Sequence, residues 1–384
     1  MTGGADQRVR ELLGRAVAAG RFPGAVAEWG RAGGEVSSCA EGQARVEDRP
    51  RDVTTDTWFD LASLTKPLVT TTLSLLAFRE TVLAPDTRVG EVLRETKRSP
   101  VGELEIHHLL THSSGLPAWL PFYCLAEGRR TKVAQALRQI EVESRPGQRV
   151  IYSCVGFIIL GMMLEEVSGS DLERLFRTRV LVPAGLENDL GFNPDSTLRL
   201  LAGGASRALA EQRLVLDLGL DPGWIPGVGW GLPDDGNARF LGGAAGNAGL
   251  FGTVRGVRRL TAEYCCGGTN LLTSEEVGPA VTSQTGGLAQ ERGWGWQIAA
   301  TRGCSAGDSL PATAFGHTGF TGVSVWAEPS GAGIWVLLTN RNHPGQRGVD
   351  LHPVRRRFHA LASARCRHAD IGEAPLTYGW SSTD

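Results

Sequence analysis

The chain has 384 residues, an apolar fraction of 41%, a charged fraction of 21% and a formal net charge of −2. This length allows two domains with a sizeable core, and the composition is that of a folded globular protein rather than a disordered one. Because the charge is small and spread along the chain, no basic patch favours nucleic acid and no polybasic segment favours an anionic membrane. The composition therefore favours small-molecule chemistry.

The N-terminal segment predicts an amphipathic helix. Val9, Leu12, Leu13, Ala16 and Val17 recur at helical spacing among charged residues, and the segment has no apolar core of the signal-peptide kind. Seven cysteines, an odd number without a CxxC pair, favour reduced thiols over a disulfide scaffold in a chain of this size. Together these features predict a cytoplasmic protein.

Strands are predicted at both ends of the chain and helices between them. Residues 24–30 and 35–42 flank Gly33-Gly34 as a hairpin, and residues 312–341 contain two or three further antiparallel strands. Residues 68–180 show helical periodicity interrupted by turns. The apolar run at 155–164 is about half of the roughly 20 residues that a membrane span needs, so it predicts a buried helix.

The second half contributes a glycine-rich segment and a terminal helix. Residues 223–253 have too little periodicity for a helix or a strand and are expected to form an ordered loop near a site. A helix over 345–366 is expected to bury Val354 and Phe358 and to expose the charge run 355–357 to solvent.

These elements predict an α+β fold with a discontinuous domain. Residues 1–65 and 250–384 are expected to share one antiparallel sheet flanked by the terminal helices. Residues 66–249 are expected to form a mostly helical domain with glycine-rich loops, and a site is expected at the junction, where clefts usually form.

The stretch FDLASLTKPLVT at 59–70 places Lys66 three residues after Ser63, at the expected start of a helix. This spacing puts both side chains on one helix face, and a helix N-terminus favours a developing alkoxide. Of the 39 lysines and arginines only three are lysines, Lys66, Lys97 and Lys132, so a position that needed only positive charge would be an arginine. A desolvated lysine, unlike an arginine, can lose its proton and act as a base. On this motif alone, a capping serine beside a solvated lysine remains the alternative.

Three further stretches accompany this motif. Tyr152 follows a Pro-Gly turn in PGQRVIYSCVGF, His317 begins the HTG of FGHTGFTG, and LLTHSSGLP occupies 109–117. In this order and spacing the stretches resemble the serine β-lactamase and penicillin-binding-protein superfamily, which has SxxK and KTG signatures. The resemblance extends over about residues 8–365. It is closest to class C β-lactamases, D-Ala-D-Ala carboxypeptidases and family VIII carboxylesterases, whose second motif is YxN and whose third is often HTG.

The resemblance implies a β-lactamase-like fold and an acyl-enzyme mechanism without metal or cofactor. Ser63 would be the nucleophile, Lys66 would keep its hydroxyl activated, and Tyr152 would move the proton to the leaving group and back from water. The backbone N–H groups of Ser63 and Phe320 would form the oxyanion hole. The residues expected to contact the substrate are Cys154, His317, Thr318 and Gly319.

Two departures from the family pattern bear on the substrate. Cys154 stands where the second motif usually has asparagine, and a thiol cannot offer the paired donor and acceptor of an amide. His317 stands where β-lactamases have lysine, and a histidine is mostly neutral at pH 7, so a fixed charge for a substrate carboxylate is missing. Both changes are expected to weaken recognition of acylamino carboxylates and to favour esters. The alternative is that another cation, such as Arg341, supplies the missing charge.

The sequence patterns for a zinc site, an α/β-hydrolase and a phosphate-binding loop are each incomplete or absent. His108 and His112 have the i, i+4 spacing of a zinc pair, but the HExxH glutamate and a third ligand are missing. GxSxG is absent, which argues against an α/β-hydrolase fold. The stretch GGAAGNAG lacks the GK[ST] of a phosphate loop.

The sequence therefore predicts a cytoplasmic serine hydrolase that cleaves small carboxylic esters through a Ser63 acyl-enzyme, with no nucleic-acid or membrane partner. An acyltransferase would use the same residues, and a weak β-lactamase or D-Ala-D-Ala carboxypeptidase would accept carboxylate-bearing amides. A catalytically inactive, penicillin-binding-protein-like binding module is the alternative from another class. Retention of Ser63, Lys66 and Tyr152 together argues against that module. The oligomeric state stays open.

Overall fold

The computed structural model of the chain describes residues 3–46, 50–197, 199–202, 209–221, 229–265, 271–343 and 349–366. Its main sheet has seven strands in the order β3-β2-β1-β11-β10-β9-β8, and all neighbours are antiparallel. The strands are β1 (Gly24–Gly30), β2 (Val36–Arg45), β3 (Arg51–Asp52), β8 (Gln297–Ile298), β9 (Phe315–Thr318), β10 (Ser324–Ala327) and β11 (Ile334–Thr339). The predicted hairpin is β1–β2, and β1 also pairs with β11, so both ends of the chain share one sheet as expected.

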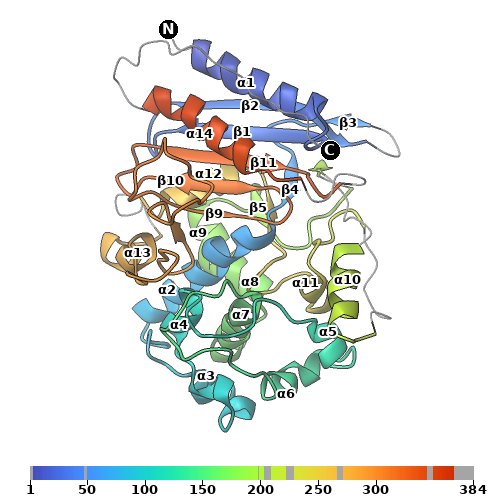
Figure 1. Cartoon of the computed structure of the whole chain (residues 1–384), viewed down its shortest axis with the longest axis vertical. Helices are drawn as coiled ribbons and strands as arrows, with labels where there is room; N and C mark the ends of the chain where they lie inside the picture. The colour runs from blue at the N-terminus through green and yellow to red at the C-terminus, as the bar shows by residue number, and fades with distance from the viewer. Residues whose placement is uncertain are drawn as a thin grey trace.

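Side chains of the central strands alternate between two hydrophobic clusters. On β1, Ala25, Ala27 and Trp29 pack under the terminal helices α1 (Gly3–Ala18) and α14 (His352–Cys366), whereas Val26 belongs to the cluster on the other face. Figure 1 shows α1 and α14 lying across one face of the sheet. Helix α12 (Val254–Ala262) contacts β1, β10 and β11 from the opposite side. This period-two alternation is required of a sheet buried on both faces.

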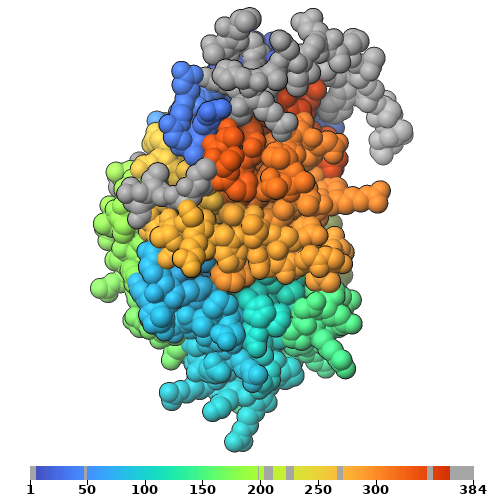
Figure 2. All heavy atoms as spheres, turned by 90° about the vertical axis from the view of Figure 1, so that its left-hand side faces the viewer, coloured from blue at the N-terminus to red at the C-terminus, as the bar shows by residue number. Residues whose placement is uncertain are grey.

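The middle of the chain is mostly helical. Its helices are α2 (Thr72–Arg79), α3 (Val89–Val92), α4 (Ile106–Leu110), α5 (Phe122–Leu125), α6 (Val133–Leu137), α7 (Cys154–Ser168), α8 (Leu172–Phe176), α9 (Val182–Ala184), α10 (Leu209–Asp217) and α11 (Gly236–Phe240), and α13 (Ser274–Val281) follows α12. A small sheet has the strand order β5 (Leu190–Gly191), β7 (Phe251–Gly252), β4 (Trp58–Asp60) and β6 (Leu201–Ala202). In Figure 2, cyan and green residues of this region gather at one end of the molecule, and orange residues of the C-terminal part gather toward the other.

Helix α7 forms the centre of the helical region, as its apolar run predicted. Ile158, Ile159 and Leu160 are successive and all buried, so the helix is enclosed rather than amphipathic. The Ser153 hydroxyl caps its N-terminus by accepting the Gly156 N–H, and Gly169, with a φ of 63°, ends it in a left-handed conformation. The Ser153 cap therefore fixes the start of α7 at Cys154, two residues after Tyr152.

The core crosses the boundary that was expected between the two domains. One hydrophobic cluster contains Val26 of β1, Leu68, Phe157 of α7 and Val336 of β11. The packing therefore does not separate residues 1–65 and 250–384 from residues 66–249. The shared sheet is confirmed, and the division into two domains stays a prediction.

Two expectations for the second half of the chain need correction. The segment expected as a loop over 223–253 contains α11 and β7 in its described part, because Asp235 caps a short helix by accepting the Ala238 N–H at 2.8 Å. The C-terminal helix buries Val354 and Phe358 as expected, but Arg355 is only 4% exposed and donates to the Val323 carbonyl. The expectation that Arg355 faces solvent was therefore wrong, and residues 344–348 lie outside the described ranges.

None of the helices in the described ranges combines the length and the hydrophobicity that crossing a membrane requires. The cysteines whose side chains the structure describes, Cys39, Cys124, Cys154, Cys265 and Cys304, are all free thiols.

Candidate active site

Ser63 lies in a strained turn rather than in the first turn of an α-helix. Residues 62–64 form a 3₁₀ turn, residues 66–71 form a π-helical turn, and α2 follows. Ala62 has a φ of 45°, a left-handed conformation that costs a residue with a side chain on the order of 1 kcal/mol. The Asp60 carboxylate accepts the Ala62 N–H at 2.8 Å, and the Thr65 hydroxyl donates to the Ala62 carbonyl at 2.6 Å. These bonds hold the turn that presents Ser63.

Lys66 is fully buried and directed at Ser63. Its Nζ donates to Ser63 Oγ at 3.0 Å, to the Asn247 carbonyl at 3.0 Å and to Cys154 Sγ at 3.4 Å. Three acceptors suit the three protons of an ammonium group. Burial lowers the pKa of Lys66, but attraction to Cys154 and Tyr152 outweighs it and leaves the pKa above its usual value. The resting lysine is therefore charged, unlike the neutral lysine that desolvation alone would produce.

The close approach of Gly246 to α7 positions the Asn247 carbonyl, which is one of the three acceptors of Lys66. Gly246 lies against α7 so closely that a Cβ at this position would be 2.0 Å from the Phe157 carbonyl. The Thr70 hydroxyl donates to the Gly246 carbonyl at 2.7 Å, and the Asn247 amide donates to the Asp235 carboxylate at 3.0 Å. Asn247 lies in GNAGLFGT, but sequence reasoning assigned it no role, because a backbone acceptor leaves no signature in the side chain.

The Tyr152 ring lies among two cations and two other rings. Its ring centroid lies 5.1 Å from Lys66 Nζ, 5.6 Å from the Arg292 guanidinium, 4.5 Å from the His112 ring and 5.8 Å from the His317 ring. Tyr152 and Ser63 line one cavity of about 420 Å³, which we call the Ser63 cavity.

The HTG segment and the residue after it are part of the lining of the Ser63 cavity. His317, Thr318, Gly319 and Phe320 all line it. A Cβ at position 319 would lie 2.9 Å from the Leu61 carbonyl, so the end of β9 approaches the nucleophile turn closely enough to require glycine. The amide of Phe320 follows directly, and its side chain is 56% exposed at the cavity.

His317 is neutral, as its sequence position suggested. Its Nδ1 lies 2.8 Å from the Thr318 carbonyl and donates to it. Burial, followed by the charges of Arg292 and Lys66, lowers the pKa of His317 well below its ordinary value. All predicted site residues are therefore brought together, except that Cys154 contacts Lys66 rather than lining the Ser63 cavity. Their catalytic roles stay predictions.

A model of the beta-lactamase family matches residues 6–360 of the chain. The chain belongs to the beta-lactamase family. It is thus a serine hydrolase of that family, which confirms the resemblance and the α+β fold drawn from the sequence. A putative D-alanyl-D-alanine carboxypeptidase of Escherichia coli strain K12 is 28% identical over 356 residues, which cover 87% of this chain and 77% of that protein.

Solved structures of several members share the fold. EstCE1, described as a hydrolase with promiscuous acyltransferase activity, has a TM-score of 0.70 and 24% identity, covering 93% of this chain and 98% of its own. Simvastatin synthase (LovD) from Aspergillus terreus has a TM-score of 0.72 and 17% identity, with coverages of 96% and 100%. A class C beta lactamase from Rhodobacter sphaeroides has a TM-score of 0.68 and 21% identity, with coverages of 94% and 100%. At these identities the likeness concerns the fold.

The beta-lactamase-family site of this chain contains more positive charge than the sequence analysis expected, and Arg341, its alternative source of charge, is one of three arginines there. Arg292, Arg341 and Arg355 line the Ser63 cavity, and of its described lining residues Asp350 is the only carboxylate. Arg292 is 6% exposed and donates to the Gln290 amide oxygen at 2.7 and 3.2 Å. Burial lowers the pKa of Arg292 and of Arg355 to about 10, so both remain charged at neutral pH.

The expectation that the site lacks a fixed cation was therefore wrong. Arg292, Arg341 and Arg355 bring positive charge to the Ser63 cavity from positions outside the third motif. Arg292, in ERGWGWQ, lies 25 positions before His317 and had no feature that separated it from the other arginines. A periodicity argument could not have found it, because its burial depends on contacts made by distant segments.

The zinc pair considered from the sequence is not supported. His112 Nδ1 accepts the Ser153 N–H at 3.0 Å, so this nitrogen is engaged. Among the described residues the candidate metal-binding group is Glu105, His107 and His108, whose potential ligand atoms lie within 4.8 Å of one another. His107 Nδ1 in that group already lies 3.1 Å from the Pro85 carbonyl.

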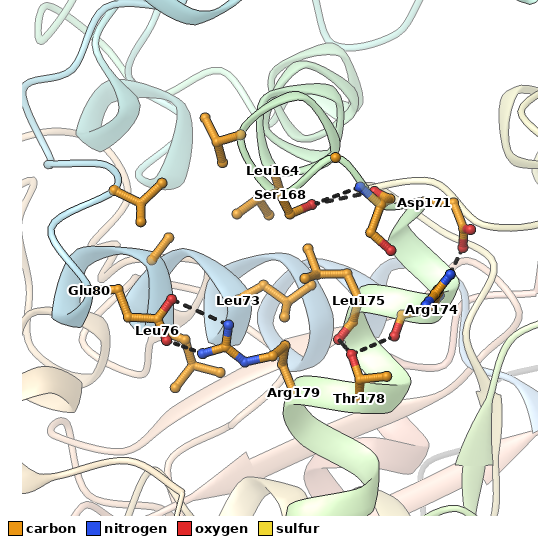
Figure 3. A pocket seen from close by; sticks show the side chains of 15 residues that line it. Leu73, Leu76, Glu80, Leu164, Ser168, Asp171, Arg174, Leu175, Thr178 and Arg179 are labelled. Atoms are coloured by element: carbon orange, nitrogen blue, oxygen red, sulfur yellow. Dashed lines mark hydrogen bonds and ion pairs between the residues drawn. The ribbon is translucent and has the colours of Figure 1, made fainter.

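A larger cavity of about 560 Å³ lies apart from this chemistry, between α2, α7 and α8. Figure 3 shows its leucine side chains, with Arg179 paired to Glu80 on one side and Asp171 and Arg174 on the other. None of the predicted catalytic residues lines it. The arrangement of Ser63, Lys66 and Tyr152, rather than cavity size, therefore locates the candidate active site.

Proposed function

We propose that the protein cleaves carboxylic esters through an acyl-enzyme on Ser63. The observation that carries the proposal is the 3.0 Å contact between the buried Lys66 ammonium and Ser63 Oγ, beside Tyr152 in one cavity. A hydrogen bond from a cation to a serine oxygen stabilises the negative charge that develops on that oxygen when the hydroxyl loses its proton. The expectations of a cytoplasmic location, of small-molecule substrates and of catalysis without metal or cofactor stay predictions.

The proposed reaction has two balanced steps. Ser63 Oγ attacks the ester carbonyl carbon, and its proton passes through the Tyr152 hydroxyl to the departing alkoxide. The amides of Ser63 and Phe320 hold the negative oxygen of the tetrahedral intermediate, each donor contributing about 3 kcal/mol. A water molecule or an alcohol then attacks the acyl-enzyme, gives its proton to the same relay and releases Ser63. Water yields hydrolysis, and an alcohol yields acyl transfer.

A second candidate function is cleavage of acyl donors that carry a carboxylate, including D-Ala-D-Ala peptides and β-lactams. The arginines of the Ser63 cavity favour it, because Arg292, Arg341 and Arg355 face a single lining carboxylate, Asp350. Guanidinium groups bind carboxylates through paired, charge-assisted hydrogen bonds. The E. coli relative named as a putative D-alanyl-D-alanine carboxypeptidase also supports this candidate.

The first experiment measures p-nitrophenol release from p-nitrophenyl butyrate, with and without added alcohol. A hydrolase turns the ester over, an acyltransferase is accelerated by the alcohol, and a binding module releases no product. The kcat/KM for p-nitrophenyl butyrate is then compared with the kcat/KM values for nitrocefin and for a D-Ala-D-Ala peptide. This comparison ranks the two candidate functions. Ester hydrolysis as the main activity is rejected if nitrocefin or the peptide has the higher kcat/KM.

A second experiment isolates the effect of the arginines. We expect wild type to prefer 3-carboxyphenyl acetate over the uncharged 3-carbamoylphenyl acetate, because the two esters differ mainly in the charge of the leaving group. Arg292→Gln and Arg355→Gln should each lower that preference by about 10- to 100-fold, since a lost partner for a buried charge is worth roughly 1 to 3 kcal/mol. The measurement is the ratio of kcat/KM values for the two esters.

Arg356→Gln is the matched control. It removes the same charge from α14, but Arg356 donates to the carbonyls of Gly303 and Cys304 and does not line the Ser63 cavity. Its preference ratio should equal that of wild type. Equal ratios in wild type, Arg292→Gln and Arg355→Gln would show that the arginines do not bind the substrate.

A further inference from the structure

His112 contacts the main chain on both sides of Tyr152. It lies in the turn that follows α4 and has a φ of 57°, a left-handed conformation that is unfavourable for a residue other than glycine. In this conformation its carbonyl accepts the Ile151 N–H at 2.9 Å, and its Nδ1 accepts the Ser153 N–H at 3.0 Å. One residue therefore binds the amides immediately before and after Tyr152.

The imidazole of His112 also packs on the phenol ring. The centroids of the His112 and Tyr152 rings are 4.5 Å apart with planes 44° apart, and the Phe157 ring lies 5.0 Å from the imidazole. His112 is 1% exposed, so this packing is enclosed. Two hydrogen bonds and one ring contact restrict the position of the Tyr152 backbone and the orientation of its ring.

His112 is neutral, and its Nδ1 can therefore accept a hydrogen bond from the main chain. Because Nδ1 accepts a hydrogen bond, the proton of the neutral ring is on Nε2. Burial, followed by the charges of Arg292, Lys66 and His317, lowers the pKa of His112 well below its ordinary value. His112 therefore keeps its acceptor throughout the ordinary pH range. It does not line the Ser63 cavity, so it has no direct access to a substrate there.

We propose that His112 is a positioning residue for Tyr152, and that it holds the phenol oxygen where it relays the proton between Ser63 and the leaving group. This inference rests on the proposed Ser63 acyl-enzyme and on the relay role of Tyr152. A displacement of about 1 Å in a reacting group lowers a rate by as much as about 10²-fold. Loss of the His112 contacts should therefore lower kcat by roughly that factor and change KM little.

The test compares His112→Leu with His112→Asn. Leucine keeps much of the volume but has no acceptor for the Ser153 N–H and disfavours the left-handed conformation. Asparagine has an oxygen at the position of Nδ1 and tolerates that conformation. His112→Leu should lose about 10²-fold in kcat, whereas His112→Asn should stay within about 10-fold of wild type. The pH profile of kcat/KM should be altered in His112→Leu and retained in His112→Asn, since it reports the ionisation of the essential acid and base of the free enzyme.

Two further variants make each outcome decisive. His108→Leu, on the preceding helical turn, should retain the wild-type kcat and pH profile. If His112→Leu does not fold, His112→Gln replaces it, because its amide lies one carbon too far from the backbone to accept the Ser153 N–H. The inference is overturned if the acceptor-deficient variant keeps the wild-type kcat, or if it and His112→Asn lose activity equally. A wild type that forms no acyl-enzyme would instead overturn the proposed function.

Discussion

Ser63→Ala is expected to lower kcat/KM for p-nitrophenyl butyrate by about 10⁴-fold or more, because it removes the nucleophile and leaves only binding and the oxyanion donors. The fold should survive the change. The Ser63 hydroxyl is one of three acceptors of Lys66, and the Asn247 carbonyl and Cys154 Sγ remain in place. The thermal unfolding midpoint should therefore stay close to that of wild type.

Intact-protein mass spectrometry checks the same prediction directly. After brief exposure to a slowly hydrolysed ester, wild type should gain the mass of one acyl group and Ser63→Ala should gain none. Ser168→Ala is the control, since Ser168 is exposed and lies at the cavity of Figure 3, away from Ser63. A Ser63→Ala protein that kept a few per cent of the activity, or that was acylated, would place the nucleophile elsewhere.

Lys66→Arg is expected to lower kcat/KM by about 10³-fold, within the range that loss of general acid–base assistance produces. Arginine keeps the positive charge, but unlike the Lys66 ammonium it cannot exchange a proton with Ser63 or Tyr152 during the reaction, because it does not lose a proton at accessible pH. Its planar fork also fits poorly where Ser63 Oγ, the Asn247 carbonyl and Cys154 Sγ converge on one nitrogen of a fully buried side chain. Steady-state kinetics of a variant verified as folded by circular dichroism is the measurement.

Comparison with Lys66→Met separates charge from proton transfer. If Lys66 supplies only a positive charge, Lys66→Arg should be much more active than Lys66→Met. If proton transfer is required, both should be similarly impaired. Lys97→Arg, at an exposed lysine, should leave the kinetics unchanged. Retention of most activity in Lys66→Arg would refute a proton-transfer role for Lys66 and leave it only a charge, with Tyr152 as the principal base.

Much of the fold could be predicted because it depends on short-range patterns. Strand β1 coincides with the predicted segment Gly24–Gly30, and its alternating side chains enter two different clusters. The buried run of α7 was equally clear from its composition. The capped five-residue helix α11 was missed, because its stability comes from the Asp235 cap and tertiary contacts rather than from periodicity.

The sequence by itself determined the terminal strands and helices and the family motifs, because these are properties of residues a few positions apart. It also identified Ser63, Lys66 and Tyr152 as the candidate catalytic residues. Only the tertiary structure decided the electrostatics of the site. Arg355 is buried against Val323, and Arg292 lies beside Tyr152, 140 positions earlier in the chain. Burial and charge at such positions depend on which distant segments meet, and local spacing does not encode that.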